Sequence, residues 1–306
     1  MIRWLILGLL LTCSLFATTQ TPPLAHIVLL GDPHLPGKNV EKKEQMLQTI
    51  NQWNDVSMVV ALGDLCEKTG TQEEYAYVKA FFSHLKHPLK PITGNHDFIY
   101  KDALDDEGNL KHASHKIQQK KLELFQQTFS LEKLYYSIQQ EPYLLIFLSA
   151  NEPKHLAQIS EEELLWFKTT LQENAHKPTI VFFHAPLENT LETYRDWVNT
   201  PNFVAQPAEE IKNIILENPQ AFLWVSGHTH TSFERSSALP NEISTYKNTI
   251  FNLHNSDLNK DEIVTHSLFL YNDKVIIKAY NHSQHKWIEN FERSLSLENL
   301  NKKRNE

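Results

Sequence analysis

Short apolar runs bounded by polar turns recur along the chain and predict a series of buried β-strands. The clearest runs cover residues 24–30, 57–62, 179–183 and 222–225. Continuous apolar runs of this length are typical of strands that are buried on both faces, as in parallel sheets. A shorter run ends just before Gly94 and predicts one more strand. We therefore expect a core that contains a buried β-sheet.

Segments with apolar residues at helical spacing lie between these runs. Residues 41–53 and 72–85 both carry such stripes, so the first part of the chain is predicted to run β-α-β-α-β. This order is typical of a parallel sheet with right-handed crossovers. Further helices are expected at residues 115–129, after a capping box that begins at Ser160, and after Pro207.

The remaining apolar runs predict further strands and a polar end of the chain. A hairpin is expected over residues 135–148, broken at Glu141-Pro142. Beyond it, three C-terminal strands are expected at residues 249–253, 263–271 and 275–280. From Glu292 the sequence is polar, and we expect it to fray.

The composition is that of a soluble globular protein with an acidic balance. Hydrophobic residues make up 41% and charged residues 22% of the 306 residues. The formal net charge is −8, from 29 basic and 37 acidic residues. An acidic surface does not favour long polyanions, so we expect no specific nucleic-acid binding surface.

The first residues have the layout of a secretory signal peptide. Arg3 precedes an apolar run over residues 4–11, and small residues follow near Ala17. The run is shorter than the roughly 20 apolar residues of a membrane span, so we expect cleavage after Ala17, export, and no stable membrane span afterwards. An uncleaved anchor and lipidation at Cys13 remain open alternatives. Only Cys66 would remain after cleavage, and a buried thiol is the simplest interpretation of it.

These features predict three parts of the chain. Residues 1–17 form the signal peptide, residues 18–291 form one domain, and residues 292–306 form the polar tail. Two segments of the domain, residues 98–116 and 188–206, are expected to be loops that influence the choice of substrate.

Polar residues with metal-binding side chains follow five of the predicted strands. The chain has only 8 glycines, and four of them directly precede such a residue. Because open α/β sheets bind ligands at the carboxyl ends of their strands, these side chains are expected to form one site. They are Asp32, His34, Asp64, Asn95, His184, His228 and His230.

This donor set favours two metal ions over one. Two carboxylates, one amide oxygen and four imidazoles are too many ligands for a single ion, but they suit two ions that share a carboxylate. Mixed nitrogen and oxygen donors favour divalent Mn, Fe, Zn or Co. Such a pair is suited to phosphate ester hydrolysis. His96 is then free to protonate the leaving oxygen or to hold the phosphate, and Asp97 is expected to orient its ring.

The order of these motifs resembles that of the calcineurin-like metallophosphoesterase family over residues 27–230. The motifs are D-x-H at Asp32, G-D at Asp64, G-N-H-D at Asn95, a lone histidine at His184 and G-H-T-H at His228. The resemblance implies an α/β fold, a four-layer α/β/β/α sandwich of two facing mixed sheets flanked by helices. It also implies that the C-terminal strands complete the second sheet.

The resemblance further implies a role for each residue of the site. The first ion would be held by Asp32, His34, Asp64 and His230. The second ion would be held by Asp64, Asn95, His184 and His228. His96 would be the catalytic histidine, and the substrate would be a small phosphate ester.

The branch of the family is a separate question. The spacing and the G-N-H-D motif are closest to the cyclic-nucleotide phosphodiesterase-like branch, which favours a phosphodiesterase. Glu67 stands where purple acid phosphatases have a metal-bound tyrosine, and this disfavours that subgroup. A phosphomonoesterase or nucleotidase and a non-catalytic metal-binding scaffold are the alternatives. Arg235 is either a phosphate contact or, more simply, part of a surface salt bridge.

Overall fold

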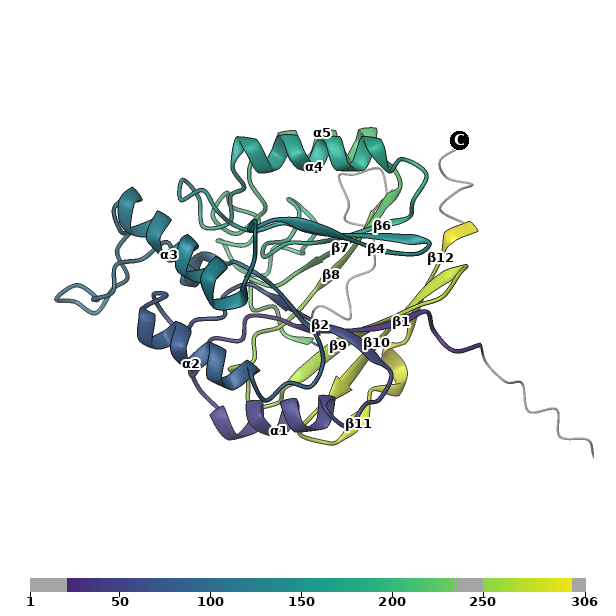
Figure 1. Cartoon of the computed structure of the whole chain (residues 1–306), viewed down its shortest axis with the longest axis horizontal. Coiled ribbons are helices and arrows are strands. Elements are labelled where there is room, and N and C mark those ends of the chain that lie inside the picture. Colours follow the sequence, from purple (N-terminus) through teal and green to yellow (C-terminus); the bar gives the residue numbers. More distant parts are fainter. Residues whose placement is uncertain (1–20, 234, 236–249, 299–306) are drawn as a thin grey trace, which may run out of the picture.

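The computed structural model describes residues 21–233, 235 and 250–298, which contain two β-sheets packed face to face between helices (Figure 1). Helices α4 (Glu161–Glu173) and α5 (Ala208–Glu217) cover the outer face of one sheet. Helices α1 (Val40–Ile50) and α2 (Gln72–Phe82) cover the other, and α3 (His115–Phe129) packs beside α2. The predicted four-layer sandwich is confirmed.

The first sheet has the strand order β11-β10-β9-β1-β2-β3, with β12 on the free part of β10. Its parallel strands are β1 (Ala25–Leu30), β2 (Val56–Leu62) and β3 (Leu89–Ile92). Its antiparallel strands are β9 (Val264–Leu270), β10 (Lys274–Asn281), β11 (Lys286–Trp287) and β12 (Arg293–Ser296).

The second sheet has the order β4-β5-β6-β7-β8. Its strands are β4 (Tyr136–Gln140), β5 (Tyr143–Phe147), β6 (Thr179–Phe182), β7 (Ala221–Ser226) and β8 (Phe251–His254). The β4–β5 pair is the predicted hairpin, and the other neighbours pair in parallel.

The prediction that the C-terminal strands complete the second sheet is wrong for all of them except β8. Strand β9 instead pairs antiparallel with β1, so that Leu268 lies opposite Ile27. Both side chains are fully buried in the core between the sheets. Strands β10 to β12 then extend this edge. Strands β9 and β10 thus extend the first sheet beyond β1 and bury their apolar side chains in the core between the two sheets.

Strand β1 shows why the apolar runs are continuous. Ile27 and Leu29 face the second sheet, whereas Val28 and Leu30 pack under α1 and α2. All four side chains are fully buried, because successive strand residues point to opposite faces and both faces are covered.

The predicted capping box at Ser160 is only half formed. The Ser160 side chain accepts a hydrogen bond from the Glu163 backbone N–H at 3.3 Å, as a capping residue should. The Glu163 carboxyl, however, accepts from the Ser149 N–H at 2.7 Å and is completely buried. This burial raises the pKa of Glu163 well above its ordinary value. The Glu163 carboxyl therefore accepts a hydrogen bond from the buried Ser149 N–H instead of the Ser160 N–H that a complete capping box would use.

The polar end of the chain is more ordered than its composition predicts. Residues 293–296 form β12 against β10, and Leu295 and Leu297 are buried. The interpretation of a fraying tail from Glu292 is thus wrong for this part, because two apolar side chains at alternate positions reach the core. Residues 1–20, including the predicted signal peptide, and residues 299–306 lie outside the described residues. Among the helices that are described, none has the length and hydropathy to cross a membrane.

Candidate metal centre

The predicted metal ligands gather where strands of both sheets end. Asp32 and His34 follow β1, Asp64 follows β2, and Asn95 lies in a short 3-10 helix, η1 (Asn95–Asp97), after β3. His184 follows β6 in the second sheet. His228 and His230 follow β7 in the same way. The site therefore spans the carboxyl ends of the two sheets, as the α/β arrangement predicts.

Five of these residues adopt a backbone conformation that is uncommon for residues other than glycine. Their φ angles are 39° for Asp32, 43° for His34, 51° for Asp64, 66° for His228 and 48° for His230. The left-handed region costs such residues on the order of 1–3 kcal/mol each and is concentrated at functional sites. The fold accepts this strain where the chain must turn sharply and point these side chains at one another.

Two glycines allow the carboxylates to approach the neighbouring strand ends. A Cβ atom on Gly94 would clash with the Asp64 carboxylate, and a Cβ atom on Gly227 would clash with the Asp32 carboxylate. Gly94 and Gly227 are thus required by the close packing of the ligand side chains themselves.

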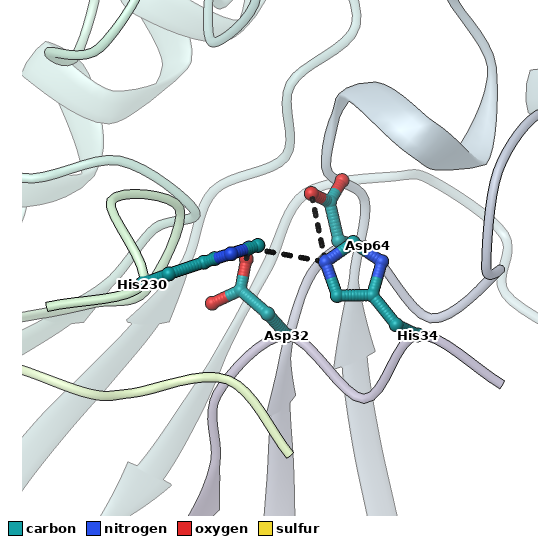
Figure 2. Close-up of side chains that lie close together, drawn as sticks. All are labelled: Asp32, His34, Asp64 and His230. Carbon is teal, nitrogen blue, oxygen red and sulfur yellow. Dashed lines mark hydrogen bonds and ion pairs between the residues drawn. The ribbon is translucent and has the colours of Figure 1, made fainter. Parts of the chain in front are cut away.

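The first cluster consists of Asp32, His34, Asp64 and His230, whose ligand atoms all lie within 4.8 Å of one another. Figure 2 shows His34 joined by dashed lines to both Asp64 and His230. Its Nε2 atom lies 3.1 Å from Nε2 of His230 and 3.9 Å from Oδ2 of Asp64. His230 Nε2 is also 3.6 Å from Oδ1 of Asp32. Two imidazole nitrogens this close need a proton or a cation between them, so this geometry fits a metal ion.

The second cluster consists of Asp64, His184 and His228. His184 Nε2 lies 3.4 Å from Oδ2 of Asp64 and 3.2 Å from Oδ1 of Asn95, which adds the amide oxygen to the set. Asp64 is the one residue that belongs to both clusters. Together the clusters are consistent with a binuclear metal site, and the structure brings all seven predicted ligands together. Their individual roles as ligands remain predictions.

Backbone carbonyls hold three of the imidazoles so that one nitrogen faces the cluster. His184 Nδ1 lies 2.8 Å from a carbonyl at the end of β2, which leaves Nε2 for the site. His228 Nε2 lies 2.8 Å from the Asn202 carbonyl, which leaves Nδ1. His34 Nδ1 contacts the Glu67 carbonyl at 3.3 Å. Outer hydrogen bonds of this kind fix the tautomer and ring orientation of metal-binding histidines.

The charges of the site favour a bound cation. Burial alone would raise the pKa of Asp64, but the neighbouring His184 and His96 hold it well below its ordinary value. Burial would lower the pKa of His184, but the charge and hydrogen bond of Asp64 raise it to about 9. Burial and the neighbouring His184 lower the pKa of His228 to about 3. A metal ion would thus replace the proton that His184 otherwise carries beside the carboxylate.

His96 lies beside the clusters without joining either of them. Its backbone N–H donates to Oδ1 of Asp64 at 2.8 Å, and its Nδ1 contacts the Lys68 carbonyl at 2.7 Å. The ring is partly exposed and lines the cavity above the site. With Nδ1 held by a carbonyl, Nε2 is the ring nitrogen available to a substrate.

The prediction that Asp97 orients the ring of His96 is wrong. The Asp97 side chain is fully buried, and Oδ1 accepts from the N–H groups of Leu65 and Cys66, both at 3.0 Å. Its Oδ2 accepts from the Gly94 N–H at 2.8 Å. Asp97 therefore joins the two loops that carry Asp64 and Asn95. Adjacent residues on a 3-10 turn point in different directions, which is why His96 finds the Lys68 carbonyl instead.

Replacing Asp97 with asparagine is expected to lower the free energy of unfolding by about 1–3 kcal/mol, because one of three buried N–H donors would face an NH₂ group. Burial and then the charge of Asp64 raise the pKa of Asp97 to about 7, so the carboxylate is fully formed only above that pH. The measurement is denaturant unfolding of the metal-free protein at pH 8. Asp106→Asn, at an exposed position, is the matched control. Equal midpoints for both variants would contradict this structural role for Asp97.

A cavity of about 610 Å³ opens onto the two clusters. Another cavity, of about 640 Å³, lies near β9 to β11 and contains none of the predicted metal ligands in its lining. The cavity at the clusters is lined in part by Asp64, Asn95 and His96. The two predicted substrate loops both contribute to it, the first through Tyr100. The second contributes Tyr194, Arg195, Trp197 and Phe203.

Several contacts of this region were not predicted. Phe203 stacks on the ring of His228, with centroids 5.2 Å apart, beside the Asn202 carbonyl that binds the same ring. The aromatic residues at positions 194–203 of the sequence could have predicted that this segment lines the cavity. Arg235 lies over the Tyr194 ring at 4.4 Å. No ion pair joins it to another described residue, and both roles predicted for it, a phosphate contact and a surface salt bridge, stay predictions. Cys66 is a buried free thiol, as predicted.

Comparisons with known proteins agree on the fold. A family model described as calcineurin-like phosphoesterase matches residues 25–232. A dimetal phosphatase from Danio rerio is 13% identical, with 90% of this chain and 99% of that chain covered and a TM-score of 0.58. A purple acid phosphatase from yellow lupin is 14% identical, with 89% and 53% covered and a TM-score of 0.58.

A third similar structure is GAP50, the anchor in the inner membrane complex of Plasmodium. It is 14% identical, with 89% of this chain and 88% of that chain covered and a TM-score of 0.54. Identities this low establish a shared fold and nothing finer. A comparison with curated proteins finds no match.

Proposed function

The chain belongs to the calcineurin-like phosphoesterase family, and on that premise we propose that it hydrolyses a small phosphate ester at a site for two divalent metal ions. The observation that carries this proposal is the shared position of Asp64 in two adjoining clusters of metal-binding side chains. The mixed nitrogen and oxygen donors fit Mn, Fe, Zn or Co, and no thiolate is among them.

The residues of the chain would divide the work as follows. When bound, two ions supply charge neutralisation for the phosphoryl oxygens and a hydroxide nucleophile at neutral pH. Asp32, His34 and His230 would hold the first ion and Asn95, His184 and His228 the second, and Asp64 would be a ligand of both. His96 would donate a proton from Nε2 to the leaving oxygen or hold the phosphate, because its Nδ1 is fixed by the Lys68 carbonyl.

Hydrolysis of a phosphodiester is our preferred form of this activity. It rests on the spacing of the motifs and on the Gly94-Asn95-His96-Asp97 sequence, which are closest to the phosphodiesterase-like branch. The rival is a phosphomonoesterase or nucleotidase, because the ions act on the same phosphoryl group in both cases. The test is to assay the metal-reconstituted protein on bis-p-nitrophenyl phosphate, p-nitrophenyl phosphate and cyclic nucleotides. Turnover of the monoester alone would favour a phosphomonoesterase or nucleotidase. Absence of turnover with every substrate would contradict the proposal that the protein hydrolyses phosphate esters.

A non-catalytic scaffold is the alternative from another class. A protein described as an anchor shares the fold, which is the observation in its favour. Two observations argue against a scaffold. His96 lines the cavity, and all seven predicted metal-binding side chains either belong to the two clusters or, for Asn95, contact a member of the second cluster. The assay above separates the two functions.

We also propose that the protein is exported. This proposal rests on Arg3 and the apolar run that ends near Ala17. Cell fractionation with sequencing of the mature N-terminus tests it. An intact chain that begins at Met1 in the cytoplasm would contradict export.

A further inference from the structure

The cavity above the metal centre is larger than a phosphate group requires. Its volume of about 610 Å³ is within the range of sites that bind whole small molecules. One side of it is formed by Tyr194, Arg195 and Trp197, and Arg235 stands beside them. None of these residues belongs to the clusters, so this side is available to a part of the substrate other than the group held at the metal centre.

The charge of this side is opposite to that of the chain as a whole. Although the net charge is −8, the charged side chains that line the cavity outside the metal centre are Arg195, Arg235 and Lys260. Lys260 is paired with the Asp257 carboxylate at 2.9 Å. Among the residues that the structure describes, no carboxylate pairs with Arg195 or Arg235. Two cations therefore face the cavity without a partner of opposite charge in the described part of the chain.

Aromatic rings hold both guanidinium groups in place. The Arg235 guanidinium lies 4.4 Å from the Tyr194 ring centroid, and that of Arg195 lies 5.7 Å from the Trp197 ring. Tyr194 is itself fixed by a hydrogen bond of 2.8 Å between its hydroxyl and Thr231 Oγ1. A guanidinium that stacks on a ring keeps its N–H edge free for an anion, and less conformational entropy is lost on binding because it is already positioned.

The same contacts argue against an aromatic group of the substrate as the main occupant. One face of Tyr194 is covered by Arg235, and Trp197 is in contact with both Arg195 and Phe203, the latter at 4.4 Å between centroids. Phe203 is in turn stacked on His228. These rings are already used within the protein. In the described part of the chain no hydrogen-bond acceptor occupies the N–H edges of the two arginines, so these edges are the feature that remains for recognition.

We propose that Arg195 and Arg235 form a second anion subsite, and that the substrate carries a second anionic group, a phosphate or a carboxylate, besides the phosphate at the metal centre. The inference rests on the proposed function for the position of the reacting phosphate. It narrows the substrate class to esters with an additional negative charge on the group that the metals do not hold.

Titration calorimetry of the metal-reconstituted protein tests this subsite with simple probes. The probes are alkylphosphonates and alkane-α,ω-bisphosphonates of three to six carbons, which differ only in the second anionic group. A hydrogen-bonded charge contributes about 1.5–3 kcal/mol, so at the best chain length the bisphosphonate should bind at least about 10-fold more tightly. Arg235→Gln and Arg195→Gln should each lose much of this preference, and the double variant should lose all of it.

Arg293→Gln is the matched control, because Arg293 is also exposed and lies over a ring, that of Phe291, away from the cavity. It should keep the full preference. Equal affinity for both probe types at every length, or a preference that survives in the double variant, would overturn the subsite. Because binding is measured without turnover, this result is independent of the assay on nitrophenyl esters. Absence of turnover with an intact preference would refute the proposed function alone.

Discussion

Replacing Asp64 with alanine is expected to remove both metal ions and to lower kcat/KM for phosphate esters by at least about 10⁴-fold. Asp64 is the residue common to the two clusters, and its carboxylate lies 3.9 Å from His34 Nε2 and 3.4 Å from His184 Nε2. Without it, each cluster loses a negatively charged ligand at once. Both ions would then be held mainly by neutral imidazoles in a buried environment, which disfavours unpaired positive charge.

Two matched variants make this expectation specific. Asp32 belongs only to the first cluster and His184 only to the second. Elemental analysis after reconstitution and desalting should therefore find about two ions in the wild type, about one in Asp32→Ala and in His184→Ala, and nearly none in Asp64→Ala. Circular dichroism confirms that each variant is folded. One full ion retained by Asp64→Ala would mean that this carboxylate does not serve both positions.

Replacing His96 with asparagine is expected to leave both metal ions in place and to lower kcat/KM by about 10²–10⁴-fold, or roughly 3–5 kcal/mol of barrier. The ring lines the cavity and belongs to neither cluster. Within the described part of the chain, its hydrogen bonds join Nδ1 to the Lys68 carbonyl and the backbone N–H to Asp64. The side chain can thus be changed without removing a metal ligand.

The loss should depend on the leaving group if His96 donates a proton. A nitrophenolate leaves readily without a proton, whereas an alkoxide such as a ribose oxygen does not. The deficit should therefore be smaller for p-nitrophenyl esters than for alkyl or nucleoside esters, with His115→Asn, at an exposed position, as the control. Equal deficits for the two ester types would assign His96 to phosphate binding instead. Loss of metal in His96→Asn would contradict its separation from the clusters.

The sequence alone predicted the site because its signals are local. Strands β1, β2, β6 and β7 are continuous apolar runs, and polar ligands directly follow each of them. Parallel strands bring such ends to one edge of each sheet, which gathers Asp32 with Asp64 in the first sheet and His184 with His228 in the second. The packing of the two sheets then brings Asp32 to His228, 196 positions further along the chain. The backbone N–H of His228 donates to Asp32 at 2.9 Å, which links the two sheets at this point.

Features that depend on distant packing were not predicted. Strand β9 pairs with β1 and buries Leu268 and Leu270 in the core between the sheets, and the alternation in its sequence does not reveal this partner. The partners of Asp97 are backbone amides of another loop, and backbone groups carry no sequence signal. For the same reason the contact between His228 Nε2 and the Asn202 carbonyl could not be predicted from the sequence.

The central claim is that one carboxylate joins two metal positions, and anomalous scattering from crystals of the reconstituted protein tests it most directly. Data collected at the absorption edge of the added metal should show two peaks on either side of the Asp64 carboxylate. One peak should lie among the side chains of the first cluster and the other among those of the second. A single peak at full occupancy, or two peaks with Asp64 in contact with only one of them, would contradict the claim.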